Sequence, residues 1–323
     1  MNYIEKILEL RYAINQQLLP LINSNYVYLE LPYYENIGDT LIWEGTLEFL
    51  KQVKHKCLYR ASLSTYYNHY ITEDTLILLQ GGGNFGDLWN CNHSFRKKII
   101  EFYPNNKVII FPQTVWYESQ ENVKADEIFF ARFPNVTICV RDKVSFKFMQ
   151  EHFPRNKILL VPDMAFFIDF EKFGKINTTK TDRTLYAKRI DKELKCDVWP
   201  SFIPKNAEVH DWPTIEKKAP KYARADYLVG WFNFFGNIKG IKPVNHLIDL
   251  MRIHFYRTQY IRDCVKFVNQ YDIIYSTRLH IAIASAMMGK KVYLMDNSYG
   301  KNFNFYDTWL MDLVNIEKTK EIS

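Results

Sequence analysis

The stretch from Tyr271 to Asp296 constrains the fold more than any other part of the sequence. Residues 273–275 form a short apolar run typical of a buried strand, residues 281–288 are small and apolar as in a buried helix, and residues 291–295 return to strand character. Gly289 marks the end of the helix between them. A strand, a helix and a second strand in so short a span indicate a βαβ unit, and therefore a parallel sheet.

The loop between the first strand and the helix of this unit carries Ser276, Thr277, Arg278 and His280. In an open parallel sheet, ligands bind at the carboxyl ends of the strands, where the first N–H groups of the next helix are unpaired and attract anions. Two hydroxyls, a guanidinium and an imidazole suit a phosphate or a phospho-carboxylate there, and Arg278 could bind it with two hydrogen bonds. Alternatively, Ser276 or Thr277 only caps the helix, Arg278 is solvated and His280 packs in the core. These residues alone do not separate the two interpretations.

In the amino-terminal half, short apolar runs alternate with segments whose apolar residues have the spacing of a helix. We predict strands at residues 26–31, 57–61, 75–80, 107–111, 136–140 and 158–161, and helices at residues 4–19, 41–53 and 143–153. Apolar strands that alternate with helices are typical of a doubly wound parallel sheet, which here extends to about residue 168.

Polar residues and glycines follow several of these strands. Gly38 allows a tight turn after the first strand, and Asp39 or Thr40 could cap the helix that follows. Gly81-Gly82-Gly83 follows a later strand, where glycines leave backbone N–H groups accessible to a ligand. The run lacks the Gly-Lys-Ser/Thr ending of a Walker loop and is not a dinucleotide fingerprint, so it indicates a site without naming the ligand.

The composition changes after the first sheet. Residues 169–182 are charged and threonine-rich and are expected to link two domains. A second unit restarts with a strand at residues 184–188, continues through an irregular stretch to about residue 220 and helices within residues 244–268, and ends with the βαβ unit. We therefore expect an α/β fold of two Rossmann-like domains that face a cleft. The first domain comprises residues 1–170 and the second comprises residues 171–300. Residues 301–323 are expected to form a helix that packs back on the first domain.

Composition narrows the class of protein. With 47% hydrophobic and 24% charged residues, the 323-residue chain is typical of a globular protein. The five cysteines form no Cys-x-x-Cys pair, which fits a reducing compartment, and neither a signal peptide nor a run of roughly 20 apolar residues is evident. These features predict a cytoplasmic protein. The net charge of +6 favours anionic partners, although no nucleic-acid motif is present. Lys217, Lys218, Lys221 and Arg224 could attract a diphosphate or anionic lipids, or could be solvated loop charges.

Eight polar motifs occur in order at the strand ends, and they are Asn36-Ile-Gly-Asp39, Gln80-Gly-Gly-Gly-Asn84-x-Gly-Asp87, Pro112-Gln113-Thr114, Arg141-Asp142, Asp163-x-Ala165, Arg189-x-Asp191-x-Glu193, Ser276-x-Arg278-Leu279-His280 and Asn297-Ser-Tyr-Gly-Lys301. Taken together, they resemble the motifs of polysaccharide pyruvyltransferases of the bacterial capsule and exopolysaccharide type, and the resemblance spans nearly the whole chain.

The resemblance implies a fold similar to the two-domain glycosyltransferase-B type. It also implies a phosphoenolpyruvate donor and transfer of pyruvate as a ketal onto a sugar of a surface polysaccharide. Arg278, Leu279 and His280 are implied to bind the donor and to act in catalysis, and the acceptor is implied to lie on the amino-terminal domain. The motif that begins at Arg189 departs from the family pattern, because the polar segment Tyr-Ala-Lys precedes it.

The chemistry of ketal formation suggests specific roles for these residues. The hypothesis is that Arg278 and the N–H groups of Leu279 and His280 hold phosphate, and that His280 is the general acid. Asp39 or Asp87 is then the candidate base for the attacking hydroxyl. Further donor-binding candidates are Ser276, Thr277, Arg141 and Arg189, and acceptor-binding candidates are Asn36, Gly82, Gly83, Asn84 and Gln113. The reaction requires no metal and no cofactor beyond the phosphoenolpyruvate substrate.

The expected acceptor is an oligosaccharide on an undecaprenyl-diphosphate carrier at the inner face of the membrane, with galactose ketalised at its 4- and 6-hydroxyls. This would bring the protein into peripheral contact with the inner membrane. Two other functions fit parts of the sequence. A nucleotide-sugar glycosyltransferase of the same fold could use Asp296 for ribose. A non-catalytic carbohydrate-binding protein would use the polar strand ends only as caps.

Overall fold

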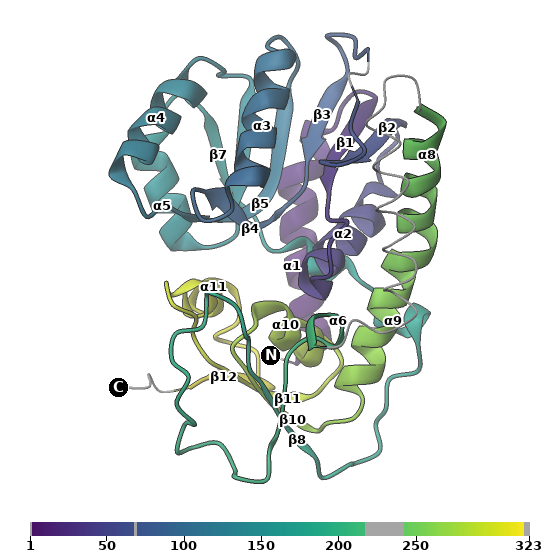
Figure 1. The fold of residues 1–323 in the computed structure, drawn as a ribbon, viewed down its shortest axis with the longest axis vertical. Helices are drawn as coiled ribbons and strands as arrows, with labels where there is room; N and C mark the ends of the chain where they lie inside the picture. The colour runs from purple at the N-terminus through teal and green to yellow at the C-terminus, as the bar shows by residue number, and fades with distance from the viewer. Residues whose placement is uncertain (1, 68–69, 217–241, 320–323) are drawn as a thin grey trace.

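The computed structural model describes residues 2–67, 70–216 and 242–319, and in this part of the chain two parallel sheets lie one above the other (Figure 1). The strands are β1 (Tyr26–Leu31), β2 (Cys57–Ser62), β3 (Leu76–Leu79), β4 (Gly82–Gly86), β5 (Val108–Trp116), β6 (Val136–Val140), β7 (Lys157–Leu160), β8 (Thr184–Ala187), β9 (Glu208–His210), β10 (Ile273–Ser276), β11 (Lys291–Leu294) and β12 (Ile316–Lys318).

The α-helices are α1 (Tyr3–Leu18), α2 (Ile37–Leu50), α3 (Asn90–Phe102), α4 (Gln120–Ala131), α5 (Lys143–His152), α6 (Pro213–Glu216), α8 (Lys242–Met251), α9 (Arg257–Val268), α10 (Leu279–Met287) and α11 (Lys301–Trp309). Short 3-10 turns are η1 (Leu19–Leu21), η2 (Met164–Phe167) and η3 (Phe170–Phe173), and the π-helical segment η4 (Arg252–Tyr256) joins α8 to α9. The basic cluster of Lys217, Lys218, Lys221 and Arg224 lies outside the described residues.

The first sheet has the strand order β2-β1-β3-β5-β6-β7, all parallel, and β4 pairs with the end of β5. Side chains along β1 alternate between the two faces of the sheet, as the two-residue period of a strand requires. Val27 and Leu29 pack in a core with helices α3, α4 and α5, whereas Tyr26 and Tyr28 pack in a second core with α1 and α2. The sheet is therefore covered by helices on both faces, which confirms the predicted α/β class with parallel strands.

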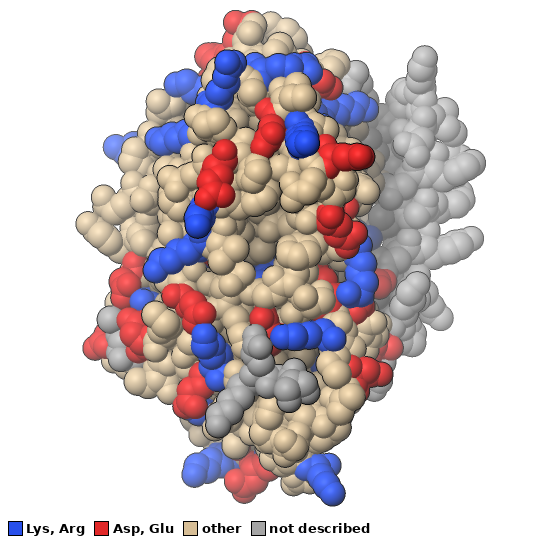
Figure 2. All heavy atoms as spheres, turned by 90° about the vertical axis from the view of Figure 1, so that its left-hand side faces the viewer, with Lys and Arg blue, Asp and Glu red and all other residues tan. Residues whose placement is uncertain are grey.

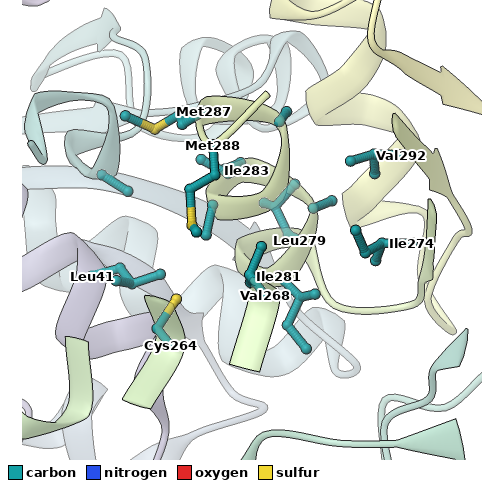
Figure 3. Close-up of a cluster of buried hydrophobic side chains, with 14 of the residues drawn as sticks. Leu41, Cys264, Val268, Ile274, Leu279, Ile281, Ile283, Met287, Met288 and Val292 are labelled. Carbon is teal, nitrogen blue, oxygen red and sulfur yellow. The ribbon is translucent and has the colours of Figure 1, made fainter. Parts of the chain in front are cut away.

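The second sheet has the order β12-β11-β10-β8-β9, also parallel. Helix α10 is almost wholly buried, because its sequence is apolar on every side. Figure 3 shows it enclosed by α2, α9 and the sheet, with Leu279, Ile281 and Ile283 near Leu41, Cys264, Val268, Ile274 and Val292. Packing on all sides fixes the position of the helix, and therefore of the polar residues at its amino-terminal end.

Several segments of the described chain join the two sheets. Helix α1 contributes Leu10 to the core around α10 and Ile14 to the core of the first sheet. The run from α8 through η4 to α9 extends along one side of the molecule, past both sheets (Figure 1). At the end of the chain, α11 contacts α5, where Trp309 Nε1 donates to the carbonyl of Arg141 at 2.9 Å. Residues 301–323 are not one helix, because α11 ends at Trp309 and β12 adds a strand to the second sheet.

One local expectation was wrong. Helix α2 begins four residues earlier than the predicted residue 41, and its cap is Asn36, whose side chain accepts from Gly38 N at 3.0 Å, rather than Asp39 or Thr40. The glycine run continues into a strand that was not predicted, because Gly82–Gly86 forms β4. Gly86 has a φ of 112°, and a Cβ there would lie 1.9 Å from the carbonyl oxygen of Trp116, so only glycine fits.

The surface is of mixed charge on the face shown in Figure 2, where acidic and basic side chains are interspersed and no large area carries one sign. The net charge of +6 is therefore not concentrated as a basic patch on this face. Among residues 2–67, 70–216 and 242–319, no helix combines the length and the apolar character needed to cross a membrane.

Candidate active site

A cavity of about 410 Å³ is lined by residues that follow strands of both sheets. It is lined by Tyr34, Asn36, Asp39, Gly83, Asn84, Trp89, Cys91, Asn92, Arg141, Arg189, Asp191, Glu193, Trp212, Ile215, Arg278, Leu279, His280 and Lys301. Among the predicted site residues, Asn36, Asp39, Gly83, Asn84, Arg141, Arg189, Arg278, Leu279 and His280 therefore share one cavity.

Strand order explains why these residues meet. In the first sheet the chain runs from β1 outward to β2 and then returns to the other side of β1 with β3. In the second sheet it runs from β8 outward to β9 and then returns with β10. Ligands in such sheets bind beyond the carboxyl ends of the strands at these reversal points. Residues 34–39 and 83–84 follow β1 and β3, and residues 189–193 and 278–280 follow β8 and β10.

The guanidinium of Arg278 is held by two carboxylates. Its Nε and Nη2 bind the two oxygens of Asp211, with Nη2 at 2.5 Å from Oδ2, and Nη2 also lies 3.0 Å from Asp191 Oδ2. Within the described ranges, Nη1 of Arg278 has no hydrogen-bond partner. The expected two-bond contact to phosphate is therefore not available from Nε and Nη2, and Nη1 is the group that remains for a ligand.

His280 lies in the first turn of α10 and is the centre of a charged cluster. Its Nε2 is 3.3 Å from Asp163 Oδ2 and 3.5 Å from Arg141 Nη1, and Arg141 Nη1 binds the same carboxylate oxygen at 2.5 Å. Burial alone would raise the pKa of Asp163, but the charges of His280 and Arg141 lower this pKa well below its usual range. Asp163 therefore stays ionised and can orient and stabilise a protonated imidazole.

Glu193 connects the other two basic residues of the cavity. Arg189 Nη1 and Lys301 Nζ each lie 2.8 Å from Glu193 Oε2, and Asn297 Nδ2 donates to it at 3.1 Å. Arg189 also binds Asp191. Burial would raise the pKa of Glu193, but Lys301 and Arg189 lower it well below the usual range. The carboxylate thus holds both cations at the wall of the cavity.

The wall formed by the first sheet carries amides and one carboxylate. Asn36 Nδ2 donates to Asp39 Oδ2 at 2.8 Å, and Asp39 lines the cavity in the first turn of α2. Asn84 lies on β4 and also lines the cavity. Asp39 is therefore placed where a hydroxyl bound at this wall could reach it.

Five predicted site residues do not line the cavity: Gly82, Asp87, Gln113, Ser276 and Thr277. Asp87 accepts from the backbone N–H groups of Glu118 and Ser119 at 2.7 and 3.0 Å, so its assignment as the base is corrected. Gln113 is fully buried, and its Nε2 donates to Gln80 O at 2.7 Å, so it cannot contact a sugar in the cavity.

Ser276 and Thr277 are buried and bind backbone rather than ligand. Ser276 Oγ accepts from Arg278 N at 3.1 Å, and Thr277 Oγ1 accepts from Arg189 N at 2.9 Å. These hydroxyls hold the loops that carry the two arginines, so the donor-binding role predicted for them is replaced by a supporting one.

Sequence reasoning missed several residues of the site. Asp163, Asp191, Glu193 and Lys301 occur in the quoted motifs, but the sequence offered no role for them. No sequence motif pointed to Asp211. It follows the three-residue strand β9, in a stretch that was predicted to be irregular. Within the part of the chain that the structure describes, no group of at least three His, Cys, Asp or Glu side chains could hold a metal ion.

Gly38 is expected to be essential for the position of His280. A Cβ at residue 38 would lie 2.9 Å from His280 Nδ1 and 3.1 Å from its Cβ, so Gly38→Ala must displace the imidazole. Because alanine favours a helix over glycine, the thermal stability should change little. We expect the turnover number to fall by about 10²-fold, as for a catalytic group misplaced by about 1 Å. Unchanged turnover at normal melting temperature would contradict this.

The pH dependence of stability should report the ion pairs of Glu193. Its pKa is lower in the folded protein, so the pair stabilises the fold above the ordinary carboxyl pKa of about 4.3, and this stabilisation is lost as the pH falls through the folded pKa. Glu193→Gln should therefore lower the melting temperature at pH 7, and the difference from the wild type should shrink below about pH 4. Parallel melting curves across this range would exclude the assignment.

Comparison with known proteins gives the same fold and a family. The fold matches the crystal structure of a functionally uncharacterised protein from Klebsiella pneumoniae subsp. pneumoniae NTUH-K2044, with a TM-score of 0.62, 19% identity and 98% of each chain covered. The sequence is 30% identical over 289 residues to a Bacillus subtilis (strain 168) protein with the provisional name pyruvyl transferase EpsO, covering 89% of this chain and 86% of that one.

A second relative, pyruvyl transferase 1 of Schizosaccharomyces pombe, is 26% identical over 290 residues, covering 86% of this chain and 68% of that one. The family model of polysaccharide pyruvyl transferases matches residues 36–299, which include every residue that lines the cavity except Tyr34 and Lys301. The chain therefore belongs to the polysaccharide pyruvyl transferase family, and it is a polysaccharide pyruvyltransferase.

Proposed function

We propose that the enzyme transfers pyruvate from phosphoenolpyruvate to a pair of sugar hydroxyls and that the cavity between the two sheets is where this occurs. The observation that carries the proposal is the convergence of Arg141, Arg189, Arg278 and Lys301 on one cavity with His280 at a helix start. A small molecule with one phosphate and one carboxylate could contact Arg278 at the start of α10 and Arg189 and Lys301 on the neighbouring wall. In this proposal the two sheets and their helices act as the two domains of a glycosyltransferase-B-like enzyme.

The phosphate is proposed to bind at the amino-terminal end of α10. Arg278 occupies the cap position without a side-chain cap, so the first N–H groups of the helix, those of Leu279 and His280, remain for an anion. Nη1 of Arg278 adds a further donor. Arg189 and Lys301 on the neighbouring wall would balance the carboxylate of the donor.

The charge balance of the cavity supports a role for His280 as the acid. Each basic side chain already has a carboxylate partner, because Arg141 binds Asp163, Arg278 binds Asp211, and Arg189 and Lys301 bind Glu193. An anionic donor therefore favours the form of the site with an additional proton. His280, beside Asp163, is the residue that can hold this proton.

The proposed reaction conserves atoms and protons. His280 donates a proton to the methylene carbon of phosphoenolpyruvate, and the electrons of the double bond form the new C–H bond. The first sugar hydroxyl adds to the neighbouring carbon and gives its proton to Asp39. The carbon–oxygen bond to phosphate then breaks, the second hydroxyl adds at the same carbon, and its proton leaves with the phosphate. Return of the first proton from Asp39 to His280 restores both residues for the next turnover. The products are the ketal and inorganic phosphate, and neither a metal nor a further cofactor takes part.

For the acceptor, we propose a galactose unit ketalised at its 4- and 6-hydroxyls. It would be part of an oligosaccharide on a lipid diphosphate carrier such as undecaprenyl diphosphate, processed at the cytoplasmic face of the inner membrane during capsule or exopolysaccharide synthesis. The support is the family, which implies a polysaccharide acceptor. A nucleotide-sugar donor is less well supported, because Asp296, the carboxylate proposed for ribose, accepts from Asn297 N and Phe303 N and does not line the cavity.

The experiment that tests the donor and acceptor is mass spectrometry of lipid-linked oligosaccharides incubated with the enzyme and phosphoenolpyruvate. The expected product carries the mass of one pyruvyl ketal, with release of one phosphate. Thermal shift with phosphoenolpyruvate and a panel of nucleotide sugars provides the comparison of donors. Stabilisation by a nucleotide sugar and not by phosphoenolpyruvate would overturn the proposal.

A further inference from the structure

A fully buried ion pair lies directly behind the wall of the cavity formed by the first sheet. Arg96 of α3 donates through Nε and Nη2 to the two carboxylate oxygens of Glu30, at 2.7 and 2.6 Å. Both side chains have no exposed surface. Glu30 also has a φ of 71°, a left-handed conformation that costs free energy in any residue other than glycine. A buried pair on a strained residue adds little stability, so it is expected to serve another purpose.

The pair binds two asparagines that line the cavity. Arg96 Nη1 donates to the backbone carbonyl of Asn84 at 3.0 Å, and Nη2 donates to the side-chain oxygen Oδ1 of Asn84 at 2.5 Å. Asn92 Nδ2 donates to Glu30 Oε1 at 3.0 Å. Both asparagines are 8% exposed.

These contacts fix which way each amide points. A guanidinium only donates, so Asn84 must turn its oxygen towards Arg96 and keep its NH₂ group away from it. A carboxylate only accepts, so Asn92 must turn its NH₂ group towards Glu30 and keep its oxygen away from it. This oxygen accepts from Cys91 Sγ at 3.4 Å and has a second lone pair for a ligand. Among the residues that the structure describes, Nδ2 of Asn84 has no hydrogen-bond partner, although the side chain is more than nine-tenths buried. A buried donor without a partner at a cavity wall indicates a ligand that accepts from it.

We propose that Glu30 and Arg96 are positioning residues that present Asn84 as a donor and Asn92 as an acceptor to the hydroxyl groups of an acceptor pyranose. This inference rests on the proposed function and adds the elements that select the sugar.

The polarity of the two amides favours a sugar over the donor. A hydroxyl group both donates and accepts, so two hydroxyls of a pyranose can satisfy the NH₂ group of Asn84 and the oxygen of Asn92 together. An ionised phosphate or carboxylate only accepts and would face the oxygen of Asn92 without a proton between them. Asp39, the proposed base, lies on the same wall, since a Cβ at Gly82 would be 3.5 Å from Asp39 Oδ1 and 3.6 Å from Asn84 Oδ1. The hydroxyls held by the amides are therefore near the group that accepts their protons.

The test uses Asn84→Asp in the full chain. The variant keeps an oxygen towards Arg96, so the fold should be retained, but it replaces the donor that faces the cavity by an acceptor. The probes are 4-nitrophenyl galactoside, mannoside and N-acetylmannosaminide, whose dissociation constants are measured by saturation-transfer NMR, and phosphoenolpyruvate, measured by calorimetry. We expect the dissociation constant of the bound glycoside to rise at least about tenfold, and that of phosphoenolpyruvate, which the added charge in the cavity also repels, to rise by a smaller factor.

Two further variants complete the test. Gln120→Glu adds the same charge on the exposed first turn of α4, outside the cavity, and should leave both constants unchanged. Arg96→Lys keeps the charge but loses the planar fork that contacts Glu30 and Asn84 together, so it should weaken glycoside binding selectively. The inference is overturned if wild type binds none of the glycosides while binding phosphoenolpyruvate, or if Asn84→Asp leaves glycoside binding unchanged. If wild type binds a glycoside but never consumes phosphoenolpyruvate with it, the proposed function fails instead, and the glycoside constants still decide this inference.

Discussion

Replacing His280 by alanine is expected to lower the turnover number by about 10²–10⁴-fold, the usual cost of removing a general acid. The imidazole lies in the cavity beside the carboxylate of Asp163 and is the proposed proton donor to phosphoenolpyruvate. Arg278, Arg189 and Lys301 remain to bind the donor in this variant. The dissociation constant of phosphoenolpyruvate, measured by calorimetry, should therefore change far less than the rate of phosphate release.

His152→Ala is the matched control for this experiment. His152 ends α5, is hydrogen-bonded to Glu127 and does not line the cavity, so its removal should leave the turnover number unchanged. Added imidazole should restore part of the activity of His280→Ala, because the vacated space lies on an open cavity. A His280→Ala enzyme that releases phosphate at the wild-type rate with acceptor present would show that another group protonates the donor.

Much of the fold and part of the site could be predicted because their signals are local. The short apolar runs around Gly289 define β10, α10 and β11 without any distant contact. Arg278 and His280 follow β10 directly, and Asn36 and Asp39 follow β1, so parallel pairing alone places all of them at strand carboxyl ends. The strand order then brings both groups to the reversal points where ligands bind. Alternation of apolar strands with helices is therefore enough to place these four residues at the binding edges of the sheets.

The contacts that hold the charged side chains could not be predicted, because their partners are distant in sequence. Arg278 is bound by Asp211, which follows a strand of only three residues, and Arg141 shares Asp163 with His280. A guanidinium at a strand end has the same sequence signal whether it is solvated, bound to phosphate or bound to a carboxylate. For this reason the sequence did not indicate that Asp211 would occupy Nε and Nη2 of Arg278 and leave Nη1 for a ligand.

Asp87 shows the converse problem. It follows the glycine run in a motif typical of a site, but its side chain binds the N–H groups of Glu118 and Ser119 and so holds the loop between β5 and α4. Short polar residues that follow a strand can bind either a ligand or the backbone of the next loop. Which of the two occurs depends on where the next loop runs, and this is set by the tertiary structure.

Removing one partner of the buried pair should cost the most stability of any change considered. Arg96→Met leaves Glu30 buried, and burial raises the pKa of Glu30 even in the presence of Arg96 and Asn92. Without the guanidinium, the carboxyl group must either remain charged in the core or take up a proton, and both cost free energy. We expect the free energy of unfolding to fall by about 3–5 kcal/mol, measured by urea denaturation. Arg132→Met is the control, because Arg132 forms an exposed pair with Glu101 that is worth about 1 kcal/mol or less.

The double variant Glu30→Gln with Arg96→Met separates the two possible purposes of the pair. If the pair exists for stability, the double variant should remain about as unstable as Arg96→Met. If it exists to orient Asn84 and Asn92, the double variant should recover much of the stability lost in Arg96→Met, because no unpaired charge is then left in the core. The amides would nevertheless lose their charged partners, so glycoside affinity should stay low while the fold is restored. Recovery of stability together with recovery of glycoside binding would contradict a positioning role for Glu30 and Arg96.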